Sequence, residues 1–204
     1  TGNEKYTEEE ISRAAELAIG LNIFDTDKKK IEDELLEKLV WLKSAILKKQ
    51  FPDKIEIIVT ERKPYVKTVY GSDCFIIDNE GVVLDKINIK DIKNYDNIIT
   101  VKNAIKFRPV VGEKIAKKNL LSCGYIYSIL DLELKKNISE AYINDNFSED
   151  IIFITIDNKK IIFGTSERIN EKNAILRQVL YKLSKEKISY SSIDLKDVDN
   201  PLIK

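Results

Sequence analysis

The sequence predicts an α+β protein built from two domains. Before Pro64 the chain reads as two amphipathic helices followed by two strands, and after Pro64 it changes to short strands with interspersed helices. A chain of 204 residues is long enough for two small domains, each with a core of its own. We expect a small domain with two helices on a short sheet over residues 1–66, and a larger mixed β domain with flanking helices over residues 67–204.

Start signals and periodicity predict the two helices of the first domain. Thr7 and Glu10 have the spacing of a capping box, and apolar residues repeat at helical intervals after them, which predicts a helix over residues 7–18. A turn is expected at Gly20. Apolar residues recur at four-residue steps over residues 27–39, so this segment is predicted to form a second amphipathic helix.

Two strands complete the first domain. Residues 41–49 and 54–62 are predicted strands joined by Gln50-Phe51-Pro52-Asp53, and the second strand alternates apolar and polar residues. Trp41 stands at the start of the first strand, where a place in the core is more frequent than an exposed contact with a partner. We therefore expect one face of this strand pair, with Trp41, to be buried.

Short strands and two helices make up the second domain. Its strands are predicted at residues 65–70, 74–77, 82–84, 97–101, 151–157, 160–164 and 190–196. The turn Asp78-Asn79-Glu80-Gly81 joins the second and third of them as a hairpin. One helix is expected between residues 113 and 136, and another with an apolar face follows residue 164. The strand over 190–196 closes the predicted pattern.

The composition excludes several classes of function. The chain has no histidine, which removes Ser-His-Asp and Cys-His catalysis and histidine metal sites. Lys and Arg equal Asp and Glu at 34 each, which disfavours nucleic acid as a partner. The sequence contains no Gly-rich phosphate loop or zinc spacing of cysteines, so no cofactor or metal is expected. Cys74 and Cys123 lie far apart in sequence; two buried thiols are favoured, and their pairing stays open.

Short motifs in the first 66 residues follow one another in a specific order. They are Gly2-Asn3, Leu21-Asn22-Ile23-Phe24, Trp41-Leu42-Lys43 with Phe51-Pro52-Asp53, and Glu61-Arg62-Lys63-Pro64. In this order and spacing they resemble the POTRA domain that opens the extracytoplasmic region of the FtsQ/DivIB family of bacterial cell-division proteins. The resemblance implies a POTRA domain over residues 1–66.

The second domain carries further motifs of the same family. Ile76-Ile77-Asp78-Asn79-Glu80-Gly81-Val82-Val83 is similar to the hairpin that begins the family's β domain. Phe163-Gly164, the helix after it and Ile193-Asp194-Leu195-Lys196 resemble its ending. Two residues depart from that ending: Lys196 stands where arginine is common, and Asp197 where an aromatic or apolar residue is common. Residues 86–150 carry no motif of the family.

The resemblance implies a non-catalytic divisome scaffold that binds FtsB (DivIC in Gram-positive bacteria) together with FtsL during septum formation. It also implies a single-pass membrane protein, with an anchor upstream of residue 1 and this region extracytoplasmic at the division septum. The expected docking surface is the open edge of strand 190–196, because an unpaired edge offers backbone groups to an extended segment. Its expected partner-binding residues are Ile193, Leu195, Lys196, Asp197, Val198, Leu202 and Ile203. In the POTRA part, Ser44, Leu47 and Lys49 are expected to serve recruitment to the division site.

Alternatives remain at this point. The strand over 190–196 is an ordinary terminal strand if the chain itself covers its edge. A POTRA-type chaperone module of an outer-membrane assembly system is a second function class, because the POTRA fold also occurs there. An extracytoplasmic enzyme is a third, and it would need a pocket with converging carboxylates.

Overall fold

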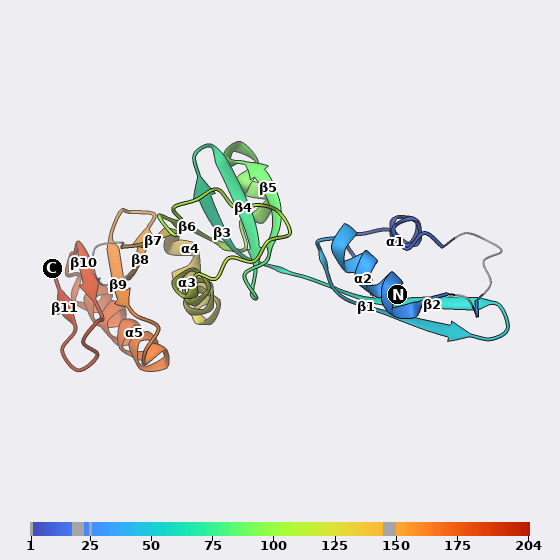
Figure 1. Cartoon of the computed structure of the whole chain (residues 1–204). Coiled ribbons are helices and arrows are strands. Elements are labelled where there is room, and N and C mark those ends of the chain that lie inside the picture. Colours follow the sequence, from blue (N-terminus) through green and yellow to red (C-terminus); the bar gives the residue numbers. More distant parts are fainter. Residues whose placement is uncertain (1, 18–22, 25, 145–149) are drawn as a thin grey trace. The chain divides into compact units, whose positions relative to one another are not determined.

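The computed structural model describes residues 2–17, 23–24, 26–144 and 150–204 and divides the chain into two compact units, Thr1–Lys63 and Pro64–Lys204 (Figure 1). The first unit holds two helices on a two-stranded sheet, and the second holds a nine-stranded mixed sheet with helices beside it. The predicted α+β class is confirmed. None of the described helices is long and apolar enough to cross a membrane.

The first unit begins with the predicted capping box. In α1 (Glu8–Ala14) the Glu10 N–H donates to Thr7 Oγ1 at 3.2 Å, and the Thr7 N–H donates to Glu10 Oε2 at 2.8 Å. The helix ends earlier than the predicted residue 18, because Glu16 has a positive φ of 53° that the helix cannot continue through. The end of that prediction and the turn at Gly20 lie outside the described residues.

The second helix and a hairpin complete the first unit. α2 (Lys28–Lys38) packs on β1 (Leu42–Gln50), which pairs antiparallel with β2 (Lys54–Glu61). Trp41 is 8% exposed, so its predicted place in the core is confirmed. The core of this unit gathers the inner faces of both helices and both strands. Its buried members are Ile11, Ala15, Leu35, Leu42, Ala45 and Val59.

Glu61 fastens the N-terminal segment to this core. Its Oε2 accepts the backbone N–H of Glu4 at 2.9 Å and of Lys5 at 2.7 Å, and its Oε1 accepts that of Tyr6 at 3.0 Å. Three N–H groups on one carboxylate are charge-assisted hydrogen bonds, which are stronger than neutral ones. The first residue of the Glu61-Arg62-Lys63-Pro64 motif therefore closes the unit by joining its two ends.

The sheet of the second unit has the strand order β11-β10-β9-β8-β7-β6-β3-β4-β5. Its strands are β3 (Pro64–Tyr70), β4 (Asp73–Asp78), β5 (Val83–Asn88), β6 (Ile99–Lys102), β7 (Ile138–Ile143), β8 (Ile151–Thr155), β9 (Lys160–Gly164), β10 (Ser192–Asp194) and β11 (Leu202–Ile203). β3 pairs with β6, β6 with β7 and β9 with β10 in parallel, and the other pairs are antiparallel.

One row of side chains crosses seven of these strands and is fully buried. Paired residues lie side by side on one face of a sheet, so the register places this row on the face that carries the core. The row consists of Ile193, Ile161, Phe153, Ala141, Val101, Thr68 and Phe75, each 0% exposed. Thr68 satisfies its buried hydroxyl by donating to the Val101 carbonyl at 2.9 Å.

The helices cover this row. α3 (Lys118–Ile129) and α5 (Ile169–Glu186) contribute Leu120, Ile126 and Leu176 to the same core. The single helix expected between residues 113 and 136 is two, α3 and α4 (Leu132–Asn137), because Leu130 takes an extended ψ of 152° between them. A short 3₁₀ helix, η1 (Ile89–Tyr95), follows β5.

Several strands differ from the sequence-based prediction, and β5 (Val83–Asn88) extends well past the predicted residue 84. β7 was not expected, because it follows α4 directly without a turn signal. The strand predicted over 190–196 is only Ser192–Asp194, and β11 follows it after a loop.

Cys74 and Cys123 are both buried and free, as favoured from the sequence. Burial raises the pKa of the Cys74 thiol to about 11, which keeps it protonated near neutral pH.

We predict that Glu61→Ala lowers the free energy of unfolding by about 1–3 kcal/mol, because three backbone N–H groups lose a charged acceptor. Urea unfolding followed by circular dichroism measures the effect, with Glu37→Ala on the exposed side of α2 as the matched control. Equal unfolding midpoints for the two variants would show that Glu61 does not fasten the segment.

Candidate partner-binding surface

The C-terminal segment forms one end of the nine-stranded sheet. β10 pairs in parallel with β9 and antiparallel with β11, and β11 is the last strand in the sheet of the described chain. The Ser191 and Ser192 N–H groups donate to the Lys204 carbonyl at 2.6 and 3.1 Å, and the Lys204 N–H donates to the Ser192 carbonyl at 3.0 Å. The outer edge therefore belongs to β11.

This arrangement corrects the prediction of an open edge at residues 190–196. The expected edge strand is an interior strand, because the chain turns after Asp194 and returns beyond Pro201 to pair with it. Pro201, which has no N–H to give to a strand, stands directly before β11 and outside the pairing. The chain thus covers the edge of β10 with its own last residues.

Three of the expected docking residues are buried in the core. Ile193 and Leu195 are 0% exposed and Val198 is 4% exposed. Ile193 belongs to the buried row, and the Leu195 N–H donates to the Ile162 carbonyl at 2.8 Å. These side chains pack in the core at the end of the sheet.

Two expected docking residues lie on the edge itself. Leu202 is 58% exposed and Ile203 is 45% exposed. Leu202 is paired with Asp194 and Ile203 with Ile193, so their side chains point to opposite faces of the sheet. In an antiparallel pair alternate residues bond to the neighbouring strand. Because Lys204 bonds to Ser192, the N–H and C=O of Ile203 point away from β10.

Lys196 lies at the turn that leaves β10. Its Nζ is 3.4 Å from Oδ2 of Asp150, which is 6% exposed, and 3.8 Å from Oδ2 of Asp194. Its stem passes over Gly164, where an added Cβ would lie 2.7 Å from Lys196 Cγ. Gly164 also has a φ of 69°, which side chains rarely adopt. The Phe163-Gly164 motif therefore makes room for Lys196.

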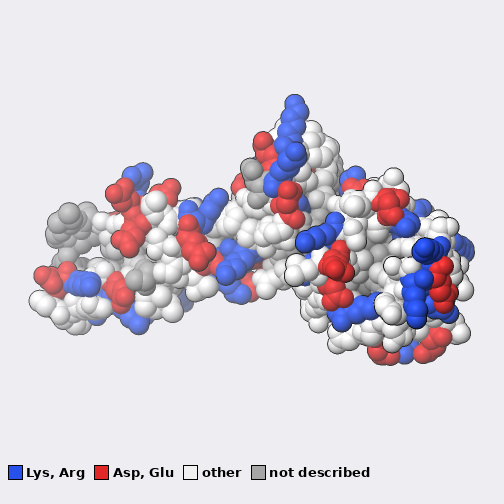
Figure 2. Space-filling model, turned by 180° about the vertical axis from the view of Figure 1, so that it is seen from behind, with Lys and Arg blue, Asp and Glu red and all other residues white. Residues whose placement is uncertain are grey.

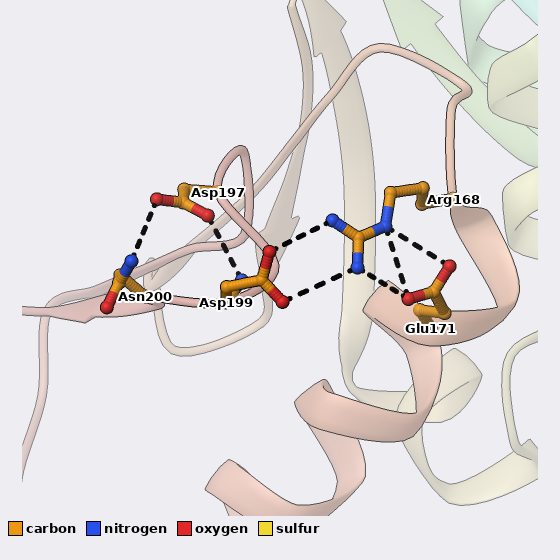
Figure 3. A network of polar contacts seen from close by, with 5 residues as sticks. All are labelled: Arg168, Glu171, Asp197, Asp199 and Asn200. Carbon is orange, nitrogen blue, oxygen red and sulfur yellow. Dashed lines mark hydrogen bonds and ion pairs between the residues drawn. The ribbon is translucent and has the colours of Figure 1, made fainter.

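Asp197 and Asp199 shape the loop between β10 and β11. Asp197 Oδ1 accepts the Asp199 N–H at 3.0 Å and its Oδ2 accepts Asn200 Nδ2 at 3.2 Å (Figure 3). The hydrogen bond from Asn200 and then that from the Asp199 backbone lower the pKa of the Asp197 carboxyl. Asp197 is thus engaged within the loop that precedes the edge strand.

Arg168 ties this loop to the start of α5. Its guanidinium donates to Glu171 at 2.6 Å and to Asp199 Oδ2 at 3.2 Å (Figure 3). Hydrogen bonds from Arg168 lower the pKa of Glu171, and those to Glu171 and then Asp199 raise the pKa of Arg168. This network was not predicted from the sequence. The three-residue spacing of Arg168 and Glu171 could have shown their pairing, but nothing in the sequence indicates Asp199.

The three expected residues in the first unit do not form one surface. Leu47 is 1% exposed, and its N–H donates to Glu32 Oε1 at 2.7 Å. Lys49 donates from Nζ to the Thr26 carbonyl at 2.8 Å. Ser44 is half-buried and lies an odd number of positions from both, so its side chain points to the other face of β1.

Potential metal ligands and surface charge are two further features of the described residues. Among them, no group of three or more His, Cys, Asp or Glu is placed to hold a metal ion. On the face shown in Figure 2 acidic and basic side chains are interspersed. Mixed charge of this kind gives no single-sign field over that face.

We predict that Leu195→Ala lowers the free energy of unfolding by about 2–5 kcal/mol, because it opens a cavity in a fully packed core. Leu202→Ala is the matched control and should change it by about 0.5 kcal/mol or less, because the side chain is already exposed. Denaturant titration of both variants measures the difference. A mild effect at Leu195 would contradict its structural role.

Comparison with protein families gives one match in the first unit. The model of the FtsQ-type POTRA domain matches residues 1–62. It covers both helices and both strands of the first unit, so the two helices on a two-stranded sheet are a POTRA-type domain.

Curated relatives extend over the second unit. The cell division protein DivIB of Clostridium botulinum strain Hall is 26% identical over 204 residues, covering 98% of this chain and 77% of the relative. DivIB of Clostridium tetani is 26% identical over 174 residues, covering 83% of this chain and 63% of the relative. The cell division protein FtsQ of Koribacter versatilis is 38% identical over 88 residues, covering 41% of this chain and 24% of the relative.

The chain therefore spans about three quarters of the length of the first DivIB relative and about a quarter of that FtsQ relative. The first unit thus matches the FtsQ-type POTRA domain, and over both compact units the chain is similar to bacterial cell division proteins of the FtsQ/DivIB family.

Proposed function

We propose that this chain is the extracytoplasmic part of a single-pass membrane protein and acts at the division septum as a non-catalytic scaffold of the divisome. Its partners are the FtsB/DivIC and FtsL homologues of the same cell. The similarity to FtsQ and DivIB relatives, which are named as cell division proteins, supports this role. The FtsQ-type POTRA match favours it over a chaperone module of an outer-membrane assembly system.

The observation that carries the binding mode is the end of the nine-stranded sheet at β11. A strand edge offers N–H and C=O groups to an incoming extended segment, which adds a strand to the sheet. The outward N–H and C=O of Ile203 begin such a ladder, and the exposed Leu202 and Ile203 side chains offer one apolar contact on each face. A partner segment with alternating apolar residues fits this edge.

The loop before β11 supports the same binding mode. The Arg168–Asp199 ion pair and the two hydrogen bonds on Asp197 hold the loop from both sides. The buried Val198 fixes it to the core. A partner strand therefore meets an edge that is already ordered, which lowers the entropy cost of binding. Lys196 and Asp197 contribute through this loop geometry.

The POTRA-type unit supplies a separate recruitment surface in this proposal. Of the three residues expected there, Ser44 lies on the outer face of β1, next to Ile46, which is 46% exposed. Leu47 and Lys49 act by holding β1 against α2 through Glu32 and the segment that contains Thr26.

We predict that Leu202→Asp with Ile203→Asp weakens binding of the mixed extracytoplasmic segments of the host FtsB/DivIC and FtsL homologues. The expected loss is about 2 kcal/mol, roughly thirtyfold in Kd, because each charge loses water at an apolar contact. Ile203→Pro removes the outward N–H and should cost about 1 kcal/mol, roughly fivefold. Isothermal titration calorimetry of the 204-residue chain measures both.

The matched control is Ile156→Asp with Tyr181→Asp, which adds two charges at residues that are 66% and 70% exposed and are not part of β11. Circular dichroism must show that all variants are folded. Unchanged affinity in the edge variants would overturn the edge as the docking site, and no binding by the wild-type chain at high micromolar concentration would overturn the partner assignment.

A further inference from the structure

The segment that joins β6 to α3 carries an unusual concentration of positive charge. Residues 106–118, named here the basic loop, hold five basic side chains and one acidic one, whereas the whole chain has no net charge. The basic residues are Lys106, Arg108, Lys114, Lys117 and Lys118, and the acidic one is Glu113. Four of the five are exposed and Lys117 is half-buried. The loop is therefore a local cationic surface.

The tip of the basic loop exposes three apolar side chains. Phe107 is 51% exposed, Val110 is 55% exposed and Val111 is 42% exposed, within five consecutive residues. Single exposed apolar residues are ordinary on protein surfaces, but a contiguous group marks a site of interaction. Here the group stands among the basic residues, so the same surface is both apolar and cationic.

The base of the loop is fixed, so the apolar tip cannot turn into the core. Ile105 and Ile115 are 8% and 4% exposed on either side of it. The Gly112 N–H donates to the Val83 carbonyl at 2.9 Å, and the Val83 N–H donates to the Glu113 carbonyl at 2.9 Å. The loop thus pairs with the start of β5, beside which it runs in Figure 1 (yellow-green).

One carboxylate on β4 is shared between the basic loop and β5. Asp73 makes an ion pair with Arg108, but it also pairs with Lys86 at 3.3 Å, so one carboxylate serves two cations. Lys117 and Lys118 stand at the amino end of α3, where the helix dipole is itself positive. This placement is unfavourable for the helix and becomes favourable only beside an anionic surface.

We propose that the basic loop is an interfacial docking surface for a membrane that exposes anionic phosphate headgroups. Basic side chains are attracted to such headgroups, while exposed aromatic and aliphatic side chains enter the boundary between headgroups and acyl chains. A soluble polyphosphate offers the same charge but gives the apolar tip no partner. A bilayer with anionic headgroups satisfies both halves of the loop. This proposal goes beyond the scaffold role and does not depend on it.

Co-sedimentation of the 204-residue chain with vesicles tests the proposal. Vesicles of phosphatidylcholine alone are compared with vesicles that also contain phosphatidylglycerol, at low and high salt. Lys114→Gln with Lys118→Gln should lower the partition coefficient onto anionic vesicles about thirtyfold. Each lost charge lowers it about fivefold, and the two factors multiply. Phe107→Ser with Val110→Ser should lower it severalfold, and this part should persist at high salt because it is apolar.

The matched charge control is Lys182→Gln with Lys185→Gln on the exposed side of α5, and the matched apolar control is Leu132→Ser, at a residue that is 75% exposed. Both controls should bind as the wild type does. Equal binding to the two kinds of vesicle, or equal binding by the loop variants and the wild type, would overturn the proposal. A third outcome is that the chain binds soluble polyphosphate but no vesicles, and that the Phe107→Ser, Val110→Ser variant still binds polyphosphate. This outcome would assign the loop to a soluble polyanion and overturn the membrane as its partner.

Discussion

The second unit depends on the buried row of side chains that crosses seven strands of its sheet. Every member from Ile193 to Phe75 is fully buried. The register of each strand pair is therefore fixed, because a slip of one residue would remove these side chains from the core. A slip would carry the apolar row to the opposite face. Because the row is fixed, the face of every neighbouring residue is fixed as well, including Leu202 on the edge strand.

A sheet built on such a row still ends at two edges, and different segments of the chain cover them. At β5 the basic loop bonds to Val83, the first residue of the strand, and to Gly81 in the turn before it. At the other end two residues of β11 cover β10 and leave their own outer side without a neighbouring strand among the described residues. Short or covered edges limit uncontrolled pairing. The proposed partner binds at β11, the shorter of the two covering segments. The basic loop, the longer one, carries the proposed membrane surface.

Polar contacts near the C-terminal end of the sheet position the loop that precedes β11. Gly164 makes room for the stem of Lys196, and Arg168 joins the loop of Asp199 to α5. These ion pairs are exposed and weak one by one, but they act on a loop that Val198 already fixes in the core. The loop is therefore anchored to the core and to α5 directly before the edge strand.

The sequence by itself determined the α+β class, the capping box at Thr7, both helices of the first unit and most strands, because these depend on local periodicity and turn chemistry. The motifs also led to the family. Only the tertiary structure decided that Leu195 and Val198 are buried, that β11 covers β10, that β7 exists, and that Arg168 meets Asp199. Strand order and contacts between distant residues arise from the packing of the whole sheet. A strand pattern of period two shows which residues share a face, but it does not show which face is covered or which strand lies at the edge.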